Sequence, residues 1–325
     1  MIFYDGIIYS LQGGGGISVL FNELVSRLPQ HLYYLKRYGK VRYLERYRRV
    51  PLRFPVDIFH STYYRLPYNG RCAVVTTVHD FTYEKFSSGI KKYAHSLQKK
   101  NAVMQSDLLL CVSNSTKADL LEFYGKDLDS KIRVVHNGVS HDYCFLGRGF
   151  NHEVLFVGTR QGYKNFISVV KALSFIKDLT LVCVGGGGFS SQELDFLEKN
   201  LPGRYRHAGY ISNDELNVLY NTALCLVYPS LYEGFGIPIL EAMRAGCPVI
   251  AVNASSIPEV AGNAALLLEK GSPEEIACAL EAVSDLDTRR VLVDLGLARG
   301  QMFSWDMTYK KTIEAYEELL GRNLL

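Results

Sequence analysis

The 325-residue sequence lacks an apolar run of the ~20 residues that a membrane-spanning helix needs. It also lacks any C-x-x-C pair and any His and Cys cluster with metal-ligand spacing, so these residues predict no metal site. The seven cysteines are odd in number and most lie in apolar runs, which is typical of buried free thiols in a reducing compartment. The first five residues are already strand-like and leave no room for a signal peptide, so we expect a cytoplasmic protein.

Two four-glycine runs lack the spacing of the common nucleotide-binding motifs. Gly13–Gly16 and Gly185–Gly188 each follow a predicted strand and precede a predicted helix. Neither completes a G-x-G-x-x-G fingerprint, because serine or valine stands where the third glycine belongs, and neither ends in the G-K-[S/T] of a P-loop. The first run precedes an amphipathic stretch, so its backbone amides are placed to hold a phosphate at a helix N-terminus.

The positive charge of the chain is concentrated between His31 and Arg53. The formal net charge is +3, but this segment holds eight basic residues and one acid, and the remainder has 28 basic against 32 acidic residues. Tyrosines interleave with the basic residues. This composition is compatible with an ordinary solvated surface, or with contact to an anionic membrane surface or a lipid phosphate. Nucleic acid is not favoured, because no recognised binding motif accompanies the segment.

Apolar runs alternate with amphipathic stretches, the pattern of α/β units around parallel sheets. Strands are predicted at residues 2–4, 57–60, 73–78, 108–112, 132–135, 154–157, 179–184, 224–228, 249–252 and 265–268. Helices are predicted at residues 17–28, 91–104, 116–124, 164–176, 191–200, 214–220, 238–245, 273–283 and 309–320. Two comparable halves result, with a boundary where periodicity stops, so the predicted domains are residues 1–147 and 148–304. Open parallel sheets bind ligands at the carboxyl ends of their strands, which makes the cleft between the two sets of strand ends the expected site.

The stretch 228–243 carries the most informative chemistry. It is a strand end followed by a glycine-flanked turn and a helix. The helix N-terminus leaves backbone N–H groups around Gly236 and Ile237 for anionic or hydroxyl oxygens. Glu233 lies just before the helix and Glu241 about one turn inside it, and a carboxylate accepts hydrogen bonds from adjacent hydroxyls. The arrangement indicates a polyol such as a sugar or a ribose.

Charged side chains stand at two other predicted strand ends. Arg160 and Lys164 follow the strand at 154–157 and suit a phosphate, the first as a bidentate fork and the second as a point charge. His79 follows the strand at 73–78, and Asp80 is expected to orient its imidazole or to meet an acceptor. Taken one at a time, such residues are more often ordinary surface charges or structural side chains.

Together these motifs resemble retaining glycosyltransferases of family 4, of the bacterial polysaccharide-biosynthesis type. The string E-G-F-G-I-P-x-x-E-A-M, followed by A-G-C-P-V-I, is similar to the donor-site signature of that family. The blocks 156–165 and 10–19 match as well, and the likeness extends from Ile8 to Leu268. It implies the GT-B fold, with two Rossmann-like domains facing each other across a cleft and a helix within 305–325 packing back on the first domain. Segment 31–53 carries no family signature.

The resemblance also implies roles for individual residues. His79, Arg160, Lys164 and Glu233 would form the catalytic group, with the two cations neutralising the leaving diphosphate and His79 and Glu233 at the donor sugar. The remaining donor-binding residues that it implies are Gly15, Gly16, Tyr210, Ile211, Gly234, Phe235, Gly236, Ile237 and Glu241. Among these, the first two would face the diphosphate, the next two the nucleotide base, and Glu241 the ribose.

The predicted activity is metal-independent, retaining hexosyl transfer without a cofactor. A UDP-sugar is favoured as donor and GDP-mannose is the second choice. The acceptor is predicted to be a growing glycan or a lipid-linked saccharide, with the protein cytoplasmic or peripheral on the inner face of the membrane. No residue stands out as a covalent nucleophile, which favours displacement on one face of the sugar. The alternatives are a nucleotide-sugar epimerase or glycosidic phosphorylase on a similar scaffold, and a non-catalytic sugar-nucleotide-binding protein.

Overall fold

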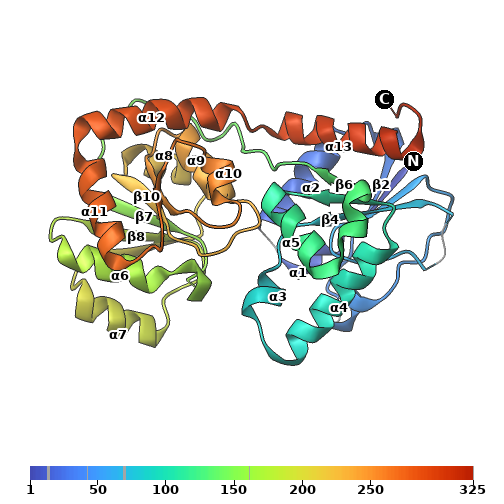
Figure 1. Ribbon diagram of the computed structural model, residues 1–325, viewed down its shortest axis with the longest axis horizontal. Helices are drawn as coiled ribbons and strands as arrows, with labels where there is room; N and C mark the ends of the chain where they lie inside the picture. The colour runs from blue at the N-terminus through green and yellow to red at the C-terminus, as the bar shows by residue number, and fades with distance from the viewer. Residues whose placement is uncertain (13–14, 42, 69–70, 161, 325) are drawn as a thin grey trace. The chain divides into compact units, whose positions relative to one another are not determined.

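The computed structural model describes residues 1–12, 15–41, 43–68, 71–160 and 162–324 (Figure 1). The chain divides into two compact units. The first unit comprises Met1–Gly138 and Ser304–Leu325, and the second comprises Val139–Phe303. Each unit contains a six-stranded sheet, and each is described by itself.

A parallel sheet forms the centre of the first unit. Its strands, in spatial order, are β2 (Tyr33–Lys36), β1 (Ile2–Asp5), β3 (Ile58–Ser61), β4 (Ala73–Val78), β5 (Leu108–Cys111) and β6 (Ile132–Val134). Every pairing is parallel. The strands β1, β3 and β5 are buried along their whole length, as in sheets covered on both faces. Apolar residues dominate them, and Asp5, His60 and Ser61 are buried polar exceptions. The chain moves from β1 to one side and returns to β3 on the other, so the crevice of this sheet lies between β1 and β3.

Helices from both ends of the chain cover this sheet. They are α1 (Ile8–Leu11), α2 (Gly16–Arg27), α3 (Thr82–Phe86), α4 (Gly89–Gln105), α5 (Asn114–Tyr124) and α13 (Trp305–Leu320), with the short 3-10 turns η1 (Gln30–Leu32), η2 (Tyr43–Tyr47) and η3 (Lys126–Lys131). The apolar face of α2 packs onto the strands, where the Phe21 ring meets those of Tyr4 and His60 edge to face. Burial of this face, rather than intrinsic propensity, accounts for most of the stability of such a helix.

The helix α13 belongs to the first unit although it follows the second unit in the chain. The buried Tyr316 hydroxyl lies 3.0 Å from the Tyr4 hydroxyl and 2.6 Å from His60 Nδ1. His60 Nε2 lies 2.9 Å from Thr77 Oγ1. Burial lowers the pKa of His60 to about 3, so the ring is neutral and both of its nitrogens are satisfied by hydroxyl groups. This series of hydrogen bonds ties α13 to β1, β3 and β4.

The second unit is also built on a parallel sheet. Its strands, in spatial order, are β12 (Leu266–Leu268), β11 (Val249–Val252), β10 (Cys225–Tyr228), β7 (Glu153–Val157), β8 (Thr180–Val184) and β9 (Tyr205–Gly209). All five pairings are parallel. The chain runs outward from β7 to β9 and returns to place β10 on the other side of β7. The switch point of this sheet therefore lies between β7 and β10, where open α/β sheets bind their ligands.

The helices of the second unit have well-defined starts. They are α6 (Phe166–Phe175), α7 (Ser191–Asn200), α8 (Asn213–Thr222), α9 (Ile237–Arg244), α10 (Ile257–Ala261), α11 (Pro273–Ser284) and α12 (Leu286–Gln301), with the 3-10 turn η4 (Gly162–Lys164). Ser190, Ser212 and Ser272 each form a capping box with a glutamate three residues later, which fixes where α7, α8 and α11 begin.

The two units divide at Gly138, upstream of the predicted boundary at residue 147. The backbone N–H of Cys144 donates to Asn217 Oδ1 at 3.0 Å, and that of Leu146 donates to Asn221 Oδ1 at 2.6 Å. Both asparagines lie on α8. These hydrogen bonds attach the polar connecting segment to the second unit.

The sequence pattern does not predict β2, β9 or α12, nor the short helices α1, α3 and α10. The strand β2 lies in the basic, tyrosine-rich segment and is half-buried at the sheet edge, so it has no apolar run. The buried positions of α12 include Arg289, Gly296 and Gly300 instead of a stripe of large apolar side chains. Arg289 donates to the carbonyls of Ala223 and Leu224, and each glycine lies against α9, so this helix packs without the usual signal.

Candidate functional site

The loops after β7 and β10 meet at the switch point of the second sheet. After β7 the chain passes through η4 to Asn165, a left-handed residue with φ 54° that precedes α6. The loop after β10 is bonded to it, because the Leu231 N–H donates to the Tyr163 carbonyl at 2.8 Å. Lys164 ends the first loop and Glu233 lies in the second. The topology alone therefore brings these two residues together from distant parts of the sequence.

Lys164 and Glu233 form an ion pair at this edge. Lys164 Nζ lies 2.5 Å from Glu233 Oε1, and the two side chains are only 14% and 13% exposed. Two serines after β11 hold the glutamate backbone: the Glu233 N–H donates to Ser255 Oγ at 2.8 Å, and Ser256 Oγ donates to the Glu233 carbonyl at 3.0 Å. The pair is thus fixed in a place that is largely shielded from water. A ligand that separates the ion pair can bind the Lys164 ammonium and the Glu233 carboxylate at the same time.

The N-terminus of α9 lies next to this ion pair. Gly236 precedes the helix with φ 114°, and Ser256 Oγ donates to the Phe235 carbonyl at 2.8 Å, which fixes the turn that also contains Gly234. In the part of the chain that the structure describes, the N–H groups of Gly236 and Ile237 donate to no protein acceptor. They are available to oxygen atoms of a ligand, and the helix dipole adds positive potential.

Glu241 lies inside α9 and has an altered acidity. Burial raises the pKa of Glu241 to about 7, although hydrogen bonds from the hydroxyls of Tyr220 and Tyr143 oppose this shift. The Tyr220 hydroxyl donates to Glu241 Oε2 at 3.1 Å. The carboxyl group is therefore only partly ionised near neutral pH until a ligand supplies further donors.

Arg160 is engaged by the protein itself. Its Nε donates to Glu193 Oε1 at 2.7 Å, and its Nη2 donates to the carbonyls of Gly187 at 2.9 Å and Gly188 at 2.8 Å. The side chain is 4% exposed. In this geometry the guanidinium holds the second glycine run against α7, and its contact with a donor diphosphate stays a prediction.

The second glycine run needs glycine for a steric reason. Gly186 has φ 72°, and a Cβ there would lie 2.4 Å from the Gly158 carbonyl oxygen, at the end of β7. The run therefore passes directly over the strand end. His207 supports it from β9: His207 Nδ1 accepts from the Gly209 N–H at 3.1 Å, so the proton is on Nε2, which donates to the Gly185 carbonyl at 2.9 Å.

Tyr210 and Ile211 follow β9, beside this histidine. The Tyr210 side chain is 86% exposed and Ile211 is half-buried. An exposed tyrosine in a turn that is fixed by its neighbours is compatible with the predicted base contact, which stays a prediction.

In the first unit, the described part of the first glycine run leads into α2 as the sequence predicts. Gly13 and Gly14 lie outside the described residues. Gly15 has an extended backbone, and Gly16 is the first residue of α2. The Gly15 carbonyl accepts hydrogen bonds from the Val19 N–H at 3.0 Å and from Ser18 Oγ at 2.9 Å. The proposed diphosphate contact of these glycines stays a prediction.

His79 follows β4 and is half-buried. Burial and, to a lesser degree, Lys99 lower the pKa of His79 to about 4, although Asp80 acts in the opposite direction. The ring is therefore neutral at physiological pH, and its Nε2 is buried with no hydrogen-bond partner among the described residues. Asp80 Oδ1 accepts from the Thr82 N–H at 2.9 Å, and the expected role of Asp80, to orient the imidazole or to meet an acceptor, stays a prediction.

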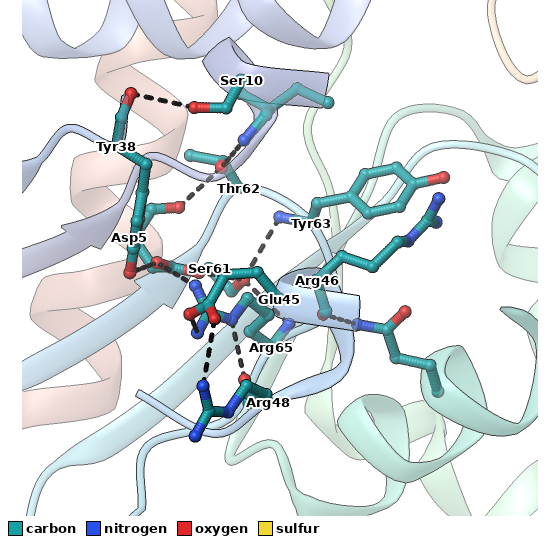
Figure 2. A network of polar contacts seen from close by, with 12 residues as sticks. Asp5, Ser10, Tyr38, Glu45, Arg46, Arg48, Ser61, Thr62, Tyr63 and Arg65 are labelled. Carbon is teal, nitrogen blue, oxygen red and sulfur yellow. Dashed lines mark hydrogen bonds and ion pairs between the residues drawn. The ribbon is translucent and has the colours of Figure 1, made fainter. Parts of the chain in front are cut away.

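A buried ionic network fills the crevice between β1 and β3 (Figure 2). Arg65 Nη1 lies 3.2 Å from Asp5 Oδ1, and Arg65 Nη2 lies 3.1 Å from Glu45 Oε1. Burial raises the pKa of Asp5, and the Arg65 charge opposes this shift. Tyr38 and Ser61 donate to the same aspartate. The network joins the basic segment to the sheet, so part of the segment is structural.

Several residues of the candidate site are not found by sequence reasoning. They are Ser255 and Ser256, which hold Glu233, and Tyr220 and Tyr143, which contact Glu241. The two serines lie shortly after β11, a predicted strand that pairs with β10. The position of β11 beside β10 in the sheet is therefore the signal that could have identified them. Across the described ranges, no group of three or more His, Cys, Asp or Glu side chains is arranged to hold a metal ion.

Two family models match the chain, and together they extend over most of it. One, described as glycosyl transferases group 1, matches residues 150–293, and the other, described as glycosyltransferase family 4, matches residues 13–143. The chain belongs to the family 4 glycosyltransferases. This family-level result agrees with the motifs around Glu233, Lys164 and the first glycine run.

Curated relatives of the glycosyltransferase include proteins named for O-antigen synthesis. The O-antigen chain mannosyltransferase B of Escherichia coli is 29% identical over 285 residues, which cover 81% of this chain and 74% of that protein. The O-antigen chain mannosyltransferase RfbU of Salmonella typhimurium is 30% identical over 216 residues, which cover 65% of this chain and 60% of that protein.

Solved structures show the fold. Anabaena HepE, in complex with UDP and glucose, is similar with a TM-score of 0.76 at 17% identity, over 97% of this chain and 98% of that chain. Sucrose-phosphate synthase from Thermosynechococcus elongatus has a TM-score of 0.69 at 21% identity, over 81% of this chain and 74% of that chain. Together with the two six-stranded parallel sheets, these similarities show that the glycosyltransferase has the two-domain GT-B fold.

Proposed function

We propose that this glycosyltransferase transfers a hexose from a nucleotide-diphosphate sugar to a saccharide acceptor, with retention of configuration and without a metal ion. One observation carries the proposal: the Lys164–Glu233 ion pair lies beside the N–H groups of Gly236 and Ile237 at the switch point of the second sheet. A cation and helix amides suit a diphosphate, and a carboxylate next to them suits sugar hydroxyls.

The same residues account for the chemistry of transfer. When the bond between the anomeric carbon and the diphosphate breaks, negative charge develops on the leaving phosphate. Lys164 exchanges its partner Glu233 for that phosphate, and Glu233 is then free to accept hydrogen bonds from the sugar. The acceptor oxygen attacks the anomeric carbon on the face that the phosphate leaves, and the leaving phosphate takes the acceptor proton. A fixed cation stabilises the developing charge without a metal ion. Retention rests on the family likeness.

The names of the sequence relatives favour mannose as the transferred sugar. A relative that matches most of the chain is named a mannosyltransferase. The Escherichia coli mannosyltransferase WbdA matches about a third of the chain, with 38% identity over 113 residues. The solved structure with UDP is only 17% identical and supports the fold alone. We therefore place GDP-mannose before the UDP-sugar that the sequence motifs favour, with a polysaccharide intermediate as acceptor.

A calorimetric titration of the protein with GDP, UDP and ADP tests this assignment. We expect GDP to bind at least about tenfold more tightly than UDP, a difference of about 1.4 kcal/mol. GDP-mannose should then be consumed in the presence of a saccharide acceptor, with turnover unaffected by a chelator. Tighter binding of UDP than of GDP would indicate a UDP-sugar as the donor. Binding of none of the three nucleotides, or epimerisation of the donor without an acceptor, would contradict the proposed transfer.

The altered acidity of Glu241 predicts a pH dependence of nucleotide binding. The group must be ionised to accept two ribose hydroxyls, and its pKa in the free protein is about 7. Lowering the pH below 7 protonates it, so affinity should fall by up to about tenfold per pH unit until the pKa of the bound state is reached. Titrations between pH 8 and pH 5.5 measure this slope. Glu241→Gln should bind weakly at every pH with no slope, whereas the exposed control Glu281→Gln should keep the slope of the natural protein.

A lipid-linked acceptor would bring the protein to a membrane surface. No helix among the described residues is both long and apolar enough to cross a bilayer. Leu44 in η2 is 69% exposed, and the side chain of Arg48, which follows η2, is 75% exposed. An exposed apolar residue next to an exposed cation supports peripheral contact with an anionic surface.

A further inference from the structure

Arg46 in η2 has hydrogen-bond donors that the protein leaves unused. Its Nε and Nη2 atoms are buried and have no partner among the described residues. The guanidinium carbon lies 4.7 Å from the centre of the Tyr63 ring and 5.2 Å from that of Tyr47. Figure 2 shows the guanidinium beside Tyr63, on the side away from Glu45. The side chain is therefore held beside two aromatic rings, and these two donors remain unused.

The neighbouring arginines differ, because their donors are used or lie in water. Arg65 bonds Asp5 and Glu45, and Arg49 donates to the Pro67 carbonyl and to Gln105. Arg48 is 75% exposed. In the described parts of the chain, no carboxylate forms an ion pair with Arg46.

Three acids in this part of the first unit have other partners. Glu45, its neighbour in sequence, faces Arg65 and Arg48. Asp80 accepts the Thr82 N–H, and Glu84 is paired with Lys99. In the described ranges, none of these three carboxylates forms an ion pair with Arg46.

The surroundings fix this cation from several elements. From α4, Gln98 Nε2 donates to the Arg46 carbonyl at 2.5 Å. The Tyr63 hydroxyl, after β3, lies 2.9 Å from His95 Nε2, and the His95 ring stacks on Tyr83 at 4.0 Å. Burial raises the pKa of Tyr63 to about 12, and the Arg46 charge and a hydrogen bond between the two side chains oppose this shift. Turning the guanidinium into solvent would break its contacts with the Tyr47 and Tyr63 rings.

A buried cation with no counter-ion and two unused donors is costly unless a ligand supplies the missing acceptors. The planar guanidinium fork matches the oxygens of a phosphate better than any single hydroxyl. We propose that Arg46 binds a phosphate group of the acceptor, next to the carboxyl ends of β3 and β4 in the first unit. This deepens the proposed function by assigning the acceptor a phosphate, carried either by a lipid or by a soluble saccharide.

Inorganic pyrophosphate is the probe for this site. It is titrated calorimetrically into the natural protein and into Lys164→Met, which lacks the cation of the donor site. We expect a pyrophosphate-binding site that is still present in Lys164→Met. Its affinity should fall about 10- to 100-fold in Arg46→Met, the usual loss for hydrogen bonds to a charged group. Arg46→Lys should retain an intermediate affinity. The exposed Arg71→Met removes the same charge from the same unit and should bind as the natural protein does.

Thermal unfolding without added anion separates a ligand role from a structural one. Removing an uncompensated buried charge should leave the melting temperature of Arg46→Met unchanged or raise it, and added pyrophosphate should stabilise the natural protein more than the variant. A marked loss of stability in Arg46→Met, together with pyrophosphate binding equal to that of Arg71→Met, would overturn the proposal. If Arg46→Met does not fold, Arg46→Lys provides the same binding comparison.

Flotation with phosphatidylcholine vesicles, with and without phosphatidic acid, distinguishes the two sources of phosphate. Loss of phosphatidic-acid-dependent flotation in Arg46→Met supports a lipid phosphate, and unchanged flotation with lost pyrophosphate binding supports a soluble one. The outcome is independent of the donor assignment: failure to bind any nucleotide contradicts the proposed function, whereas an Arg46-independent pyrophosphate titration contradicts this inference alone.

Discussion

Lys164→Met is expected to lower kcat/KM for sugar transfer by about 10²- to 10³-fold, the usual effect of removing one preorganised group that stabilises developing charge. Lys164 is nearly buried, and in the free protein it is neutralised by Glu233 at 2.5 Å. Its removal takes away the cation that the leaving phosphate requires. Steady-state kinetics with the nucleotide sugar identified by calorimetry measure the effect, and the exposed Lys171→Met in α6 is the matched control.

A double variant separates catalysis from stability at this ion pair. Lys164→Met alone leaves the Glu233 carboxylate unpaired at 13% exposure, which should cost about 3 kcal/mol of folding free energy. Lys164→Met with Glu233→Gln removes both charges, so it should regain much of this stability while remaining inactive. Activity close to that of the natural protein in a folded Lys164→Met variant would rule out the proposed role.

Gly138→Ala is expected to lower the free energy of unfolding by at least about 3 kcal/mol, at the upper end of overpacking effects. A Cβ at Gly138 would lie 2.2 Å from the Trp305 nitrogen and 2.4 Å from the Ser304 carbonyl carbon. Both atoms belong to the backbone that leads into α13, so no flexible side chain can move aside.

Urea unfolding measures this loss. Gly149→Ala is the matched control, because nothing lies within 4 Å of its added methyl group. It should change stability by less than about 0.5 kcal/mol, as is usual for open surface sites. Equal midpoints for the two variants would contradict the close approach seen at Gly138.

The sequence predicts the elements that depend on burial and misses those that depend on particular contacts. The strands β4 and β11 have the predicted bounds, because strands buried on both faces are rich in apolar and β-branched residues. The helix α12 is missed since Arg289 satisfies backbone carbonyls inside the unit, a use of arginine that composition cannot reveal. The domain boundary is displaced for a similar reason, because asparagine side chains on α8 capture the connecting segment.

At the candidate site, spacing identifies residues better than it identifies their partners. The sequence places Lys164 and Glu233 at strand ends, and the sheet order then brings them into contact. Arg160 stands only four residues before Lys164, yet the structure directs it to Glu193 and the glycine carbonyls. Which way a side chain turns depends on acceptors far along the chain, and no local motif contains that information.

The Tyr316 hydrogen bonds have a consequence for synthesis on the ribosome. Tyr4 and His60 are buried in the sheet of the first unit, and both require the Tyr316 hydroxyl as a partner. That hydroxyl emerges only after the whole of Val139–Phe303 has been translated. Domains usually fold in the order in which they are made. Here the folding of the amino-terminal unit begins first and is completed last, so the second unit can finish folding before α13 packs onto the first.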